Sequence, residues 1–425
     1  MSEFIFEKYH FNKDTSVASF NYEFDDGRRF EEKISFAKGE VLNEELLDKA
    51  LFLSFVLTGT SYAKTFPTPR ARFSPGLVID AWQAKFFNMV YQEGMSQYAY
   101  ENRLTRDDLL HFDATPVAKQ DSANYSGDGI LALQSGGKDS LLTAALLSKN
   151  NQPFMPWHVS STDHHPAVLD TFAHPLVSAQ RFLDRSALVE AATAGARNGH
   201  VPITYIVQSW AIIQAVLLGK NKVLVSAAHE GEEPYAWIGD LPINHQWSKT
   251  WSAEKAFAEY VHTYISPDIQ VGSPLRGLTE LRVAELFIQN AWQQYGHSFS
   301  SCNVANYKQG ADNSTLKWCG NCPKCANTFL LFAPFLPPSE LKSLFAGQDL
   351  FAKSTLQQTF KGLLGIDGVM KPFECVGEID ELRLAYHMAQ AKGGYQPLSF
   401  SVPDSQFDYL HEYPSQSWAK ELVGI

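Results

Sequence analysis

The stretch that decides the fold is LALQSGGKDSLLTAALL, residues 131–147. It begins with apolar residues, continues through the small and charged residues SGGKDS at 135–140, and returns to apolar residues with helical spacing. A short apolar run that leads into glycines and then into a periodic segment is typical of a buried strand, a tight loop and a helix. The sequence therefore predicts a strand at 129–134 whose end delivers a loop to the start of a helix at 138–149.

The segments after this stretch predict the same alternation of strands and helices. Such alternation indicates an α/β fold with a parallel sheet and helices on both faces. In these sheets ligands bind beyond the carboxyl ends of the strands, and the loop at 134–140 lies at such an end. The further predicted elements are strands at 154–160, 175–182 and 222–227 and helices at 186–196 and 205–219.

The chain on either side of this sheet region predicts two other regions. Before it, Phe20, Tyr22 and Phe24 alternate in the manner of a strand, and Asp26-Gly27 marks a hairpin turn. Helices are expected at 43–57, with Asn43 as the N-cap, and at 77–92, whereas the apolar segments after 335 indicate further helices. The predicted division is an N-terminal α+β domain at 1–125, the sheet domain at 126–335 and a C-terminal helical region at 336–425.

Composition and charge restrict the class of protein. With 425 residues, 45% of them hydrophobic and 13% aromatic, the chain has enough apolar material for several packed domains. Its net charge of −11 disfavours a nucleic-acid partner, because binding to a phosphate backbone needs Lys and Arg in excess on one face. The first residues lack the features of a signal peptide, and no apolar run approaches the ~20 residues of a membrane span. We therefore expect a cytoplasmic protein without a membrane partner; the sequence makes no prediction of its oligomeric state.

The loop at 135–140 has the chemistry of a phosphate-binding site. Gly136 and Gly137 let backbone N–H groups approach an anion, and the positive end of the following helix lies behind them. Ser135 and Ser140 supply hydroxyl donors, and Lys138 supplies a positive charge. The sequence therefore predicts that these five residues bind the phosphates of a nucleotide, the alternative being a glycine turn that only joins a strand to a helix.

Asp139 distinguishes this loop from the Walker A type, which has Ser or Thr after its Lys and four residues between its glycines. A carboxylate repels a phosphate unless a cation lies between them, so Asp139 predicts a bound Mg²⁺.

The string SGGKDS resembles the signature loop of the PP-loop ATP pyrophosphatases. The resemblance implies the HUP-type fold of adenine nucleotide alpha hydrolases and the binding of ATP together with Mg²⁺. It also implies cleavage of ATP to AMP and pyrophosphate, with adenylation of a carboxylate or carbonyl oxygen of the substrate. Arg181 and Asp184, near the end of the strand at 175–182, would then help to hold the adenylate.

Four of the five cysteines predict a metal site. Cys319, Cys322 and Cys325 follow one another at two-residue spacing, and Cys302 is a candidate fourth ligand. Two-residue spacing lets a tight turn present two sulfurs to one metal ion, so a closed structural zinc site is the first interpretation. An iron–sulfur cluster is the second, although Phe329 stands where the bacterial ferredoxin pattern has a cysteine. Buried apolar cysteines without a metal are the third.

Three further strings narrow the resemblance: NGHVP at 198–202, NHQWSK at 244–249 and KPFECVGE at 371–378. Together with the cysteine cluster they are similar to the ATP-dependent epimerases of the peptidoglycan precursor UDP-N-acetylmuramoyl-L-alanyl-L-glutamate. The resemblance implies adenylation of the terminal carboxylate of this sugar-nucleotide peptide, which makes the α-proton more acidic. A base then removes the proton from one face, an acid returns it on the other, and hydrolysis releases the D-glutamyl product.

The acid and base are expected among groups in these strings that can exchange a proton. Cys375 is the one cysteine outside the cluster, and its neighbours Glu374 and Glu378 could tune it or act themselves. His245 and Lys249 are four residues apart and would share one face of a helix. The alternatives are a core position for Cys375 and a surface pair for His245 and Lys249.

Other positions are weaker candidates. Asp163-His164-His165 follows a strand and is more typical of a polar loop, and His229-Glu230 follows the strand at 222–227, where pocket residues collect. Arg276 and Arg282 could bind the diphosphate or the carboxylates of the substrate, although arginines are commonly on the surface.

Two rival functions remain open at this point. One is a PP-loop enzyme of nucleoside or tRNA modification that forms an amide, nitrile or thiocarbonyl after adenylation, which the negative charge disfavours for a tRNA substrate. The other is a sensor that binds an adenine nucleotide without turnover, which the intact pair of Lys138 and Asp139 disfavours.

Overall fold

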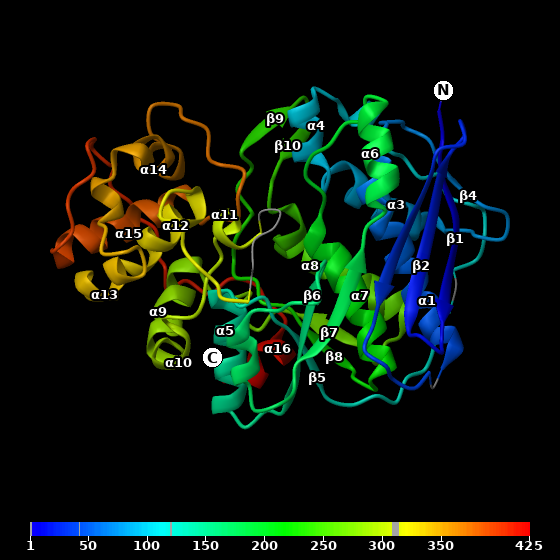
Figure 1. Cartoon of the computed structure of the whole chain (residues 1–425), viewed down its shortest axis with the longest axis horizontal. Coiled ribbons are helices and arrows are strands. Elements are labelled where there is room, and N and C mark those ends of the chain that lie inside the picture. The colour runs from blue at the N-terminus through cyan, green and yellow to red at the C-terminus, as the bar shows by residue number, and fades with distance from the viewer. Residues whose placement is uncertain (1, 42, 120, 308–313) are drawn as a thin grey trace.

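The computed structural model describes residues 2–41, 43–119, 121–307 and 314–425 (Figure 1). Within these ranges nine strands form one mixed sheet, in the order β11-β8-β5-β6-β7-β3-β2-β1-β4. The half from β11 to β7 is parallel. From β7 through β3 and β2 to β1 each strand is antiparallel to the next, and the edge strand β4 is parallel to β1. The strands are β1 (Phe4–Asn12), β2 (Val17–Phe24), β3 (Arg29–Ser35), β4 (Ala71–Phe73), β5 (Ile130–Leu133), β6 (Phe154–Ser160), β7 (Val177–Phe182), β8 (Lys222–Leu224) and β11 (Gln270–Gly272).

The predicted α/β alternation is confirmed around the decisive stretch. The strand predicted at 154–160 and the helix predicted at 138–149 have these bounds in the structure. The strand predicted at 222–227 ends at Leu224, and the next three residues line a cavity. The sequence did not predict β9 (Ala236–Ile238) and β10 (Leu241–Ile243), which form a separate two-stranded hairpin.

The N-terminal hairpin is also confirmed. Strands β2 and β3 pair on either side of the predicted turn, where Gly27 has a φ of +90°, a value that favours glycine. The side chain of Asn43 accepts a hydrogen bond from the N–H of Leu46 and caps the first helix as expected.

The sheet itself crosses the predicted boundary at 125. Strand β3 pairs with β7, and the guanidinium of Arg181 on β7 donates to the buried carboxylate of Glu32 on β3 at 2.5 Å. The division into three domains stays a prediction, but the N-terminal strands and the parallel strands share one continuous sheet.

Helices cover both faces of this sheet and form two apolar cores. Leu131 and Val223 belong to the core around α1 and α7, whereas Ala132 and Leu224 belong to the core around α5 and α9. This split follows from the alternation of side chains along a strand. The helices are α1 (Glu44–Thr58), α2 (Thr60–Ala63), α3 (Ala81–Gln92), α4 (Ser96–Asn102), α5 (Lys138–Lys149), α6 (Arg185–Thr193), α7 (Ile203–Leu217), α8 (Trp251–Tyr260), α9 (Glu280–Asn290), α10 (Trp292–Tyr295), α11 (Asn303–Asn306), α12 (Pro323–Phe332), α13 (Pro338–Ser343), α14 (Gln357–Leu363), α15 (Ile379–Lys392) and α16 (Ser417–Val423).

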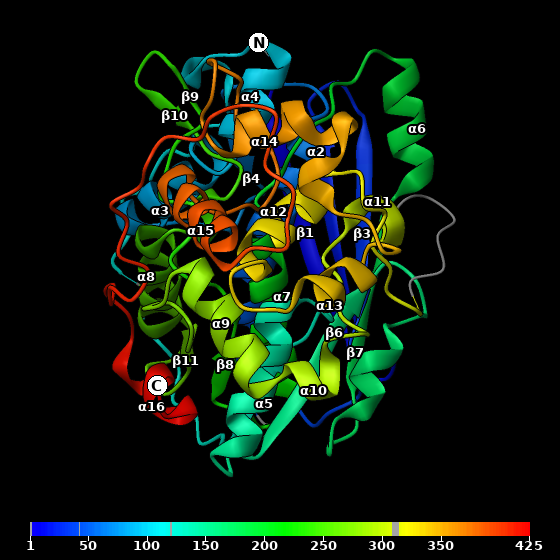
Figure 2. The same cartoon turned by 90° about the vertical axis from the view of Figure 1, so that its left-hand side faces the viewer.

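The C-terminal region is helical, as predicted. Helices α12 to α15 gather at the end of the molecule opposite to β1 and β2 (Figure 1), and α15 and α9 lie in front of the sheet when this end faces the viewer (Figure 2). The last helix, α16, returns to pack on α5. Within the described ranges, no helix is long and apolar enough to cross a membrane.

Candidate active site

A cavity of about 920 Å³ opens at the carboxyl ends of the parallel strands. Its walls come from the loop that follows β5, the end of β6 and the residues after β8, with α12 and the segment around Cys375 on the C-terminal side. This volume is in the range of small-molecule sites, and the position is the one where open α/β sheets bind ligands. The cavity therefore lies where the sequence predicts the ligand-binding site, and it is large enough for a small-molecule ligand.

The loop after β5 keeps the first turn of α5 open toward this cavity. Gly136 has a φ of +80°, which favours glycine, and a Cβ atom there would lie 2.6 Å from a methyl group of Leu316, which would have to move. Gly137 is the N-cap of α5 and, in the part of the chain that the structure describes, no side chain caps this helix. The loop therefore offers backbone N–H groups and a helix N-terminus to an anion.

Lys138 lines the cavity, and its largely buried side chain lies between two carboxylates. Its Nζ atom lies 2.5 Å from Asp139 and 2.6 Å from Glu280. Burial by itself lowers the pKa of Lys138, but the two carboxylates outweigh it, and the net shift is upward. Lys138 is therefore a fixed positive charge at the start of α5.

A second buried cation, Lys249, is connected to the first through two glutamates. Lys249 Nζ lies 3.0 Å from Glu230, and the charge of Glu230 acts on the neighbouring Glu280. Burial together with the neighbouring carboxylate raises the pKa of Glu280, whereas Lys249 and Lys138 overcome burial and lower the pKa of Glu230 to about 2. Lys249 stays charged, because Cys375 and the surrounding carboxylates raise its pKa despite burial.

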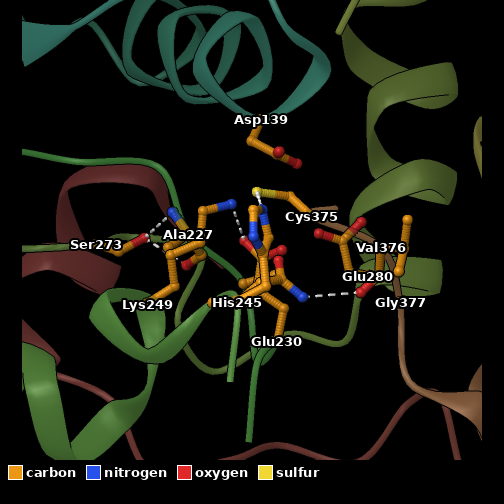
Figure 3. A network of polar contacts seen from close by, with 12 residues as sticks. Asp139, Ala227, Glu230, His245, Lys249, Ser273, Glu280, Cys375, Val376 and Gly377 are labelled. Carbon is orange, nitrogen blue, oxygen red and sulfur yellow. Dashed lines mark hydrogen bonds and ion pairs between the residues drawn. The ribbon is translucent and has the colours of Figure 1, made fainter. Parts of the chain in front are cut away.

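Cys375 and His245 face each other beside this network (Figure 3). Cys375 Sγ is 3.8 Å from His245 Nε2, and the other ring nitrogen, Nδ1, is 2.6 Å from Gln97 Oε1. Burial lowers the pKa of His245 to about 4 despite the nearby carboxylate of Glu374, so the imidazole is neutral at physiological pH. A neutral imidazole next to a thiol can accept its proton.

Three hydrogen bonds hold the backbone on both sides of Cys375. Gln246 Nε2 donates to the carbonyl of Val376 at 2.9 Å, and the N–H of Gly377 donates to Asn327 Oδ1 at 3.0 Å. The hydroxyl of Tyr235 donates to the carbonyl of Glu374 at 2.9 Å. The segment that carries the thiol to the cavity is therefore hydrogen-bonded to residues on both sides of the β9–β10 hairpin and to α12.

The structure brings together most of the residues that the sequence singled out. Cys375 and Lys249 line the same cavity as the predicted phosphate loop, and His245 stands directly behind the thiol. The loop residues on the cavity wall are Ser135, Gly137, Lys138, Asp139 and Ser140, with Gly136 at the turn between them.

Two of the predicted acidic residues lie outside the wall of the cavity. Glu374 accepts a hydrogen bond from Asn303 at 2.8 Å. Glu378 stands just before α15, where burial and the carboxylates of the glutamates at 230, 232 and 233 raise its pKa to about 7 against the opposing effect of Lys371.

The two residues predicted to hold an adenylate are engaged elsewhere. Arg181 forms the ion pair with Glu32 and donates to Ser61 at 2.8 Å. Asp184 caps α6 and accepts the N–H of Glu31 at 3.1 Å. Neither lines the cavity, whereas their neighbour Arg185 does.

Among the weaker candidates, Glu230 lines the cavity as expected, whereas the others have partners elsewhere. Arg276 is buried and pairs with Glu254, Arg282 pairs with Glu285, and His229 stacks on Tyr413 with ring centroids 3.3 Å apart. His165 pairs with Asp170 on an exposed loop.

Sequence reasoning missed Gln97, Glu280 and Lys324. Gln97 reaches His245 across 148 positions and Glu280 reaches Lys138 across 142, so no local spacing could reveal either contact. Lys324 carried a usable signal, because it lies inside the cysteine motif at the start of α12, but the motif suggested only metal binding.

The four predicted cysteines form a closed cluster. Their sulfur atoms all lie within 4.8 Å of one another, with separations of 3.6 Å for Cys302–Cys322, 3.5 Å for Cys322–Cys325 and 3.8 Å for Cys319–Cys325. Four sulfurs bound tetrahedrally to zinc at about 2.3 Å are about 3.8 Å apart, so the donor set fits a zinc ion with no open position. Gly320, with a φ of +64°, makes the turn that aims the first two sulfurs.

This cluster is built next to the cavity. Asn303 follows the ligand Cys302 and donates to Glu374, and Asn327, two residues after Cys325, accepts the N–H of Gly377. A metal bound by the cysteines would therefore stabilise the contacts that hold Cys375.

Replacement of Cys319 by serine is expected to lower metal content and to lower the free energy of unfolding by about 4 kcal/mol or more, because a structural metal site is lost. Elemental analysis and thermal unfolding measure the two effects, and elemental analysis also separates zinc from iron. The matched control is Cys375→Ser, which leaves the cluster intact and should keep the metal. Full metal content in Cys319→Ser would contradict the assignment.

Comparison with known proteins gives one consistent result. A model of the MurL N-terminal domain matches residues 1–273, and a model of the MurL C-terminal domain matches residues 298–400. The UDP-N-acetyl-alpha-D-muramoyl-L-alanyl-L-glutamate epimerase of Xanthomonas oryzae pv. oryzae (strain MAFF 311018) is 33% identical over 395 residues, which are 91% of this chain and 85% of the relative. A protein of the same name from Salinispora tropica is 32% identical over 409 residues, 93% of this chain and 86% of the relative.

Proposed function

The chain belongs to the MurL family and is an isomerase of the epimerase class, and from this premise we propose that it inverts the terminal L-glutamate of UDP-N-acetylmuramoyl-L-alanyl-L-glutamate in an ATP-dependent reaction. The product would be the D-glutamyl precursor of peptidoglycan. One observation supports the coupling most strongly: a phosphate-type loop and the thiol of Cys375, with His245 behind it, line the same cavity.

We propose further that the parallel half of the sheet is a PP-loop ATP pyrophosphatase fold. The SGGKDS loop follows β5, which lies between β8 and β6, and it leads directly into α5. Its N–H groups and Lys138 would hold the phosphates of ATP, and Asp139 would hold the Mg²⁺ ion. Bound Mg²⁺ neutralises phosphate charge and makes the α-phosphorus easier to attack.

Activation of the substrate would come first. The carboxylate oxygen next to Cα attacks the α-phosphorus, the bond to the bridging oxygen breaks, and pyrophosphate leaves. The resulting acyl adenylate no longer carries the carboxylate charge, so removal of the α-proton no longer places a second negative charge on the same atoms. After inversion, water attacks the acyl carbon and AMP leaves with the electron pair of its oxygen.

Removal of the α-proton from one face of Cα is assigned to Cys375, which lines the cavity and has His245 Nε2 within reach as a proton acceptor. Lys249 is a poor base because its pKa is raised, and we assign it the role of stabilising negative charge on the thiolate or on the carbanion. Glu374 and Glu378, which lie off the cavity wall, are weaker candidates.

Incubation of the protein with ATP, Mg²⁺ and UDP-N-acetylmuramoyl-L-alanyl-L-glutamate tests this proposal. The expected result is AMP release together with D-glutamate, measured by chromatography of the nucleotide and by chiral analysis of the hydrolysed peptide. AMP release without inversion would point to a PP-loop modification enzyme with another substrate. No AMP release in response to substrate would favour a nucleotide sensor.

A further inference from the structure

The thiol–imidazole pair continues into the N-terminal part of the chain. Helix α4 presents Gln97 and Glu101 on one face, four residues apart. Gln97 Nε2 donates to Glu101 Oε1 at 2.7 Å, and Gln97 Oε1 lies 2.6 Å from His245 Nδ1. Cys375, His245, Gln97 and Glu101 therefore form one continuous chain of polar contacts that starts at the cavity.

The order of these contacts determines which atom carries which proton. A carboxylate only accepts hydrogen bonds, so Glu101 requires the NH₂ group of Gln97 on its own side. The amide oxygen of Gln97 must then face His245, and an oxygen can only accept. The hydrogen of the neutral imidazole is consequently on Nδ1, which leaves a lone pair on Nε2, directed at Cys375.

The packing around α4 holds this geometry in place. Leu241 and Ile243 of β10 are buried against Tyr98 and Ala99 of α4. Ser96 Oγ accepts the N–H of Asn244 at 3.1 Å, which fixes the chain one residue before His245. The side chain of Gln97 is itself buried, so water does not compete for its oxygen.

The ring of His200 packs beside the imidazole of His245. Its ring centroid is 4.6 Å from that of His245, and burial lowers its pKa to about 3, so the neighbouring ring adds no charge. In the described part of the chain, Gln97 is the group that the hydrogen-bond geometry places at His245 Nδ1.

We propose that Gln97, oriented by Glu101, is a positioning residue for the epimerisation: it holds His245 in the tautomer whose Nε2 atom accepts the proton that Cys375 must lose before its thiolate removes the α-proton. This inference rests on the proposed function and deepens it. It also assigns a task to the N-terminal region, which orients His245 although none of its described residues lines the cavity.

The test compares single variants with an exchange of the two residues. Gln97→Leu removes the acceptor, and we expect exchange of the α-proton with solvent deuterium to fall by about 10²-fold, while substrate-dependent AMP release stays within about threefold. The double variant Gln97→Glu/Glu101→Gln keeps the charge and restores an oxygen toward His245 with an NH₂ group behind it. It is expected to recover exchange to within about tenfold of the wild type.

Nitrogen-15 NMR of the histidines provides a readout that does not need activity. The His245 signals, identified by their loss in His245→Gln, should show a protonated Nδ1 and an unprotonated Nε2 in the wild type and in the exchanged variant. An unprotonated Nδ1 in the wild type would overturn the inference. So would full α-proton exchange in a folded Gln97→Leu protein. If the wild type does not invert the glutamate of the substrate, the proposed function is wrong. The NMR measurement of the His245 tautomer tests the arrangement of Gln97 and His245 independently of that result.

Discussion

Replacement of Cys375 by alanine is expected to lower the inversion of glutamate by about 10²- to 10⁴-fold while AMP release continues in the presence of substrate. The thiol is the group on the cavity wall with a proton acceptor behind it, and the phosphate loop does not depend on it for any contact. Without the thiol, the acyl adenylate forms and water hydrolyses it with its configuration retained. Chromatography of AMP and chiral analysis of glutamate from the same reaction measure the separation of the two activities.

Cys375→Ser is the companion variant. It keeps the size of the side chain, but a hydroxyl is a far weaker acid than a thiol, so inversion should remain strongly impaired. Full epimerisation by Cys375→Ser would remove the thiol from the mechanism. Equal loss of AMP release and inversion in both variants would mean that Cys375 serves substrate binding instead of proton transfer.

Removal of the positive charge of Lys138 is expected to abolish AMP release and glutamate inversion together, unlike the Cys375 variants, which separate the two activities. Lys138→Met should lower AMP release by about 10²- to 10³-fold, because the residue supplies the fixed charge for the phosphates. The change also leaves Glu280 buried without its cation, which typically costs about 3–5 kcal/mol of stability. The double variant Lys138→Met/Glu280→Gln removes both charges and is the form in which activity should be compared.

Lys149→Met is the matched control for this loss. Lys149 lies at the opposite end of the same helix, where its Nζ atom donates to Asn290 on the surface. Its replacement should leave AMP release unchanged. Wild-type rates of AMP release in the double variant at 138 and 280 would rule out a role of the loop lysine in ATP cleavage.

The parts of the fold that could be predicted from the sequence are those with a strong local signal. The apolar run of β5, the glycines of the loop and the periodicity of α5 lie within a short stretch, and α5 begins and ends where it was expected. The pairing of β3 with β7 could not be predicted, because it joins segments almost 150 residues apart and depends on tertiary packing. The short strands β9, β10 and β11 have three residues each, too few for a clear alternation.

For the site too, the sequence predicts local motifs but not contacts between distant segments. The loop and the cysteine cluster each lie in one short motif, apart from Cys302, and the structure brings each of them together. Arg181 lies near the carboxyl end of β7, but its side chain pairs with Glu32 on β3 and donates to Ser61 on α2. Gln97 belongs to a helix with no motif of its own, and its role depends on the hairpin that carries His245 to it.

The central claim is that inversion proceeds through an acyl adenylate made by this chain. The most direct test uses UDP-N-acetylmuramoyl-L-alanyl-L-glutamate with oxygen-18 in the carboxylate next to Cα of the glutamate. Mass spectrometry of the nucleotide should find one oxygen-18 atom in AMP, because the bond formed with phosphorus keeps the substrate oxygen and hydrolysis at the acyl carbon leaves it there. The account predicts labelled AMP in equal amount to D-glutamate, and D-glutamate formed with unlabelled AMP, or without ATP, would contradict it.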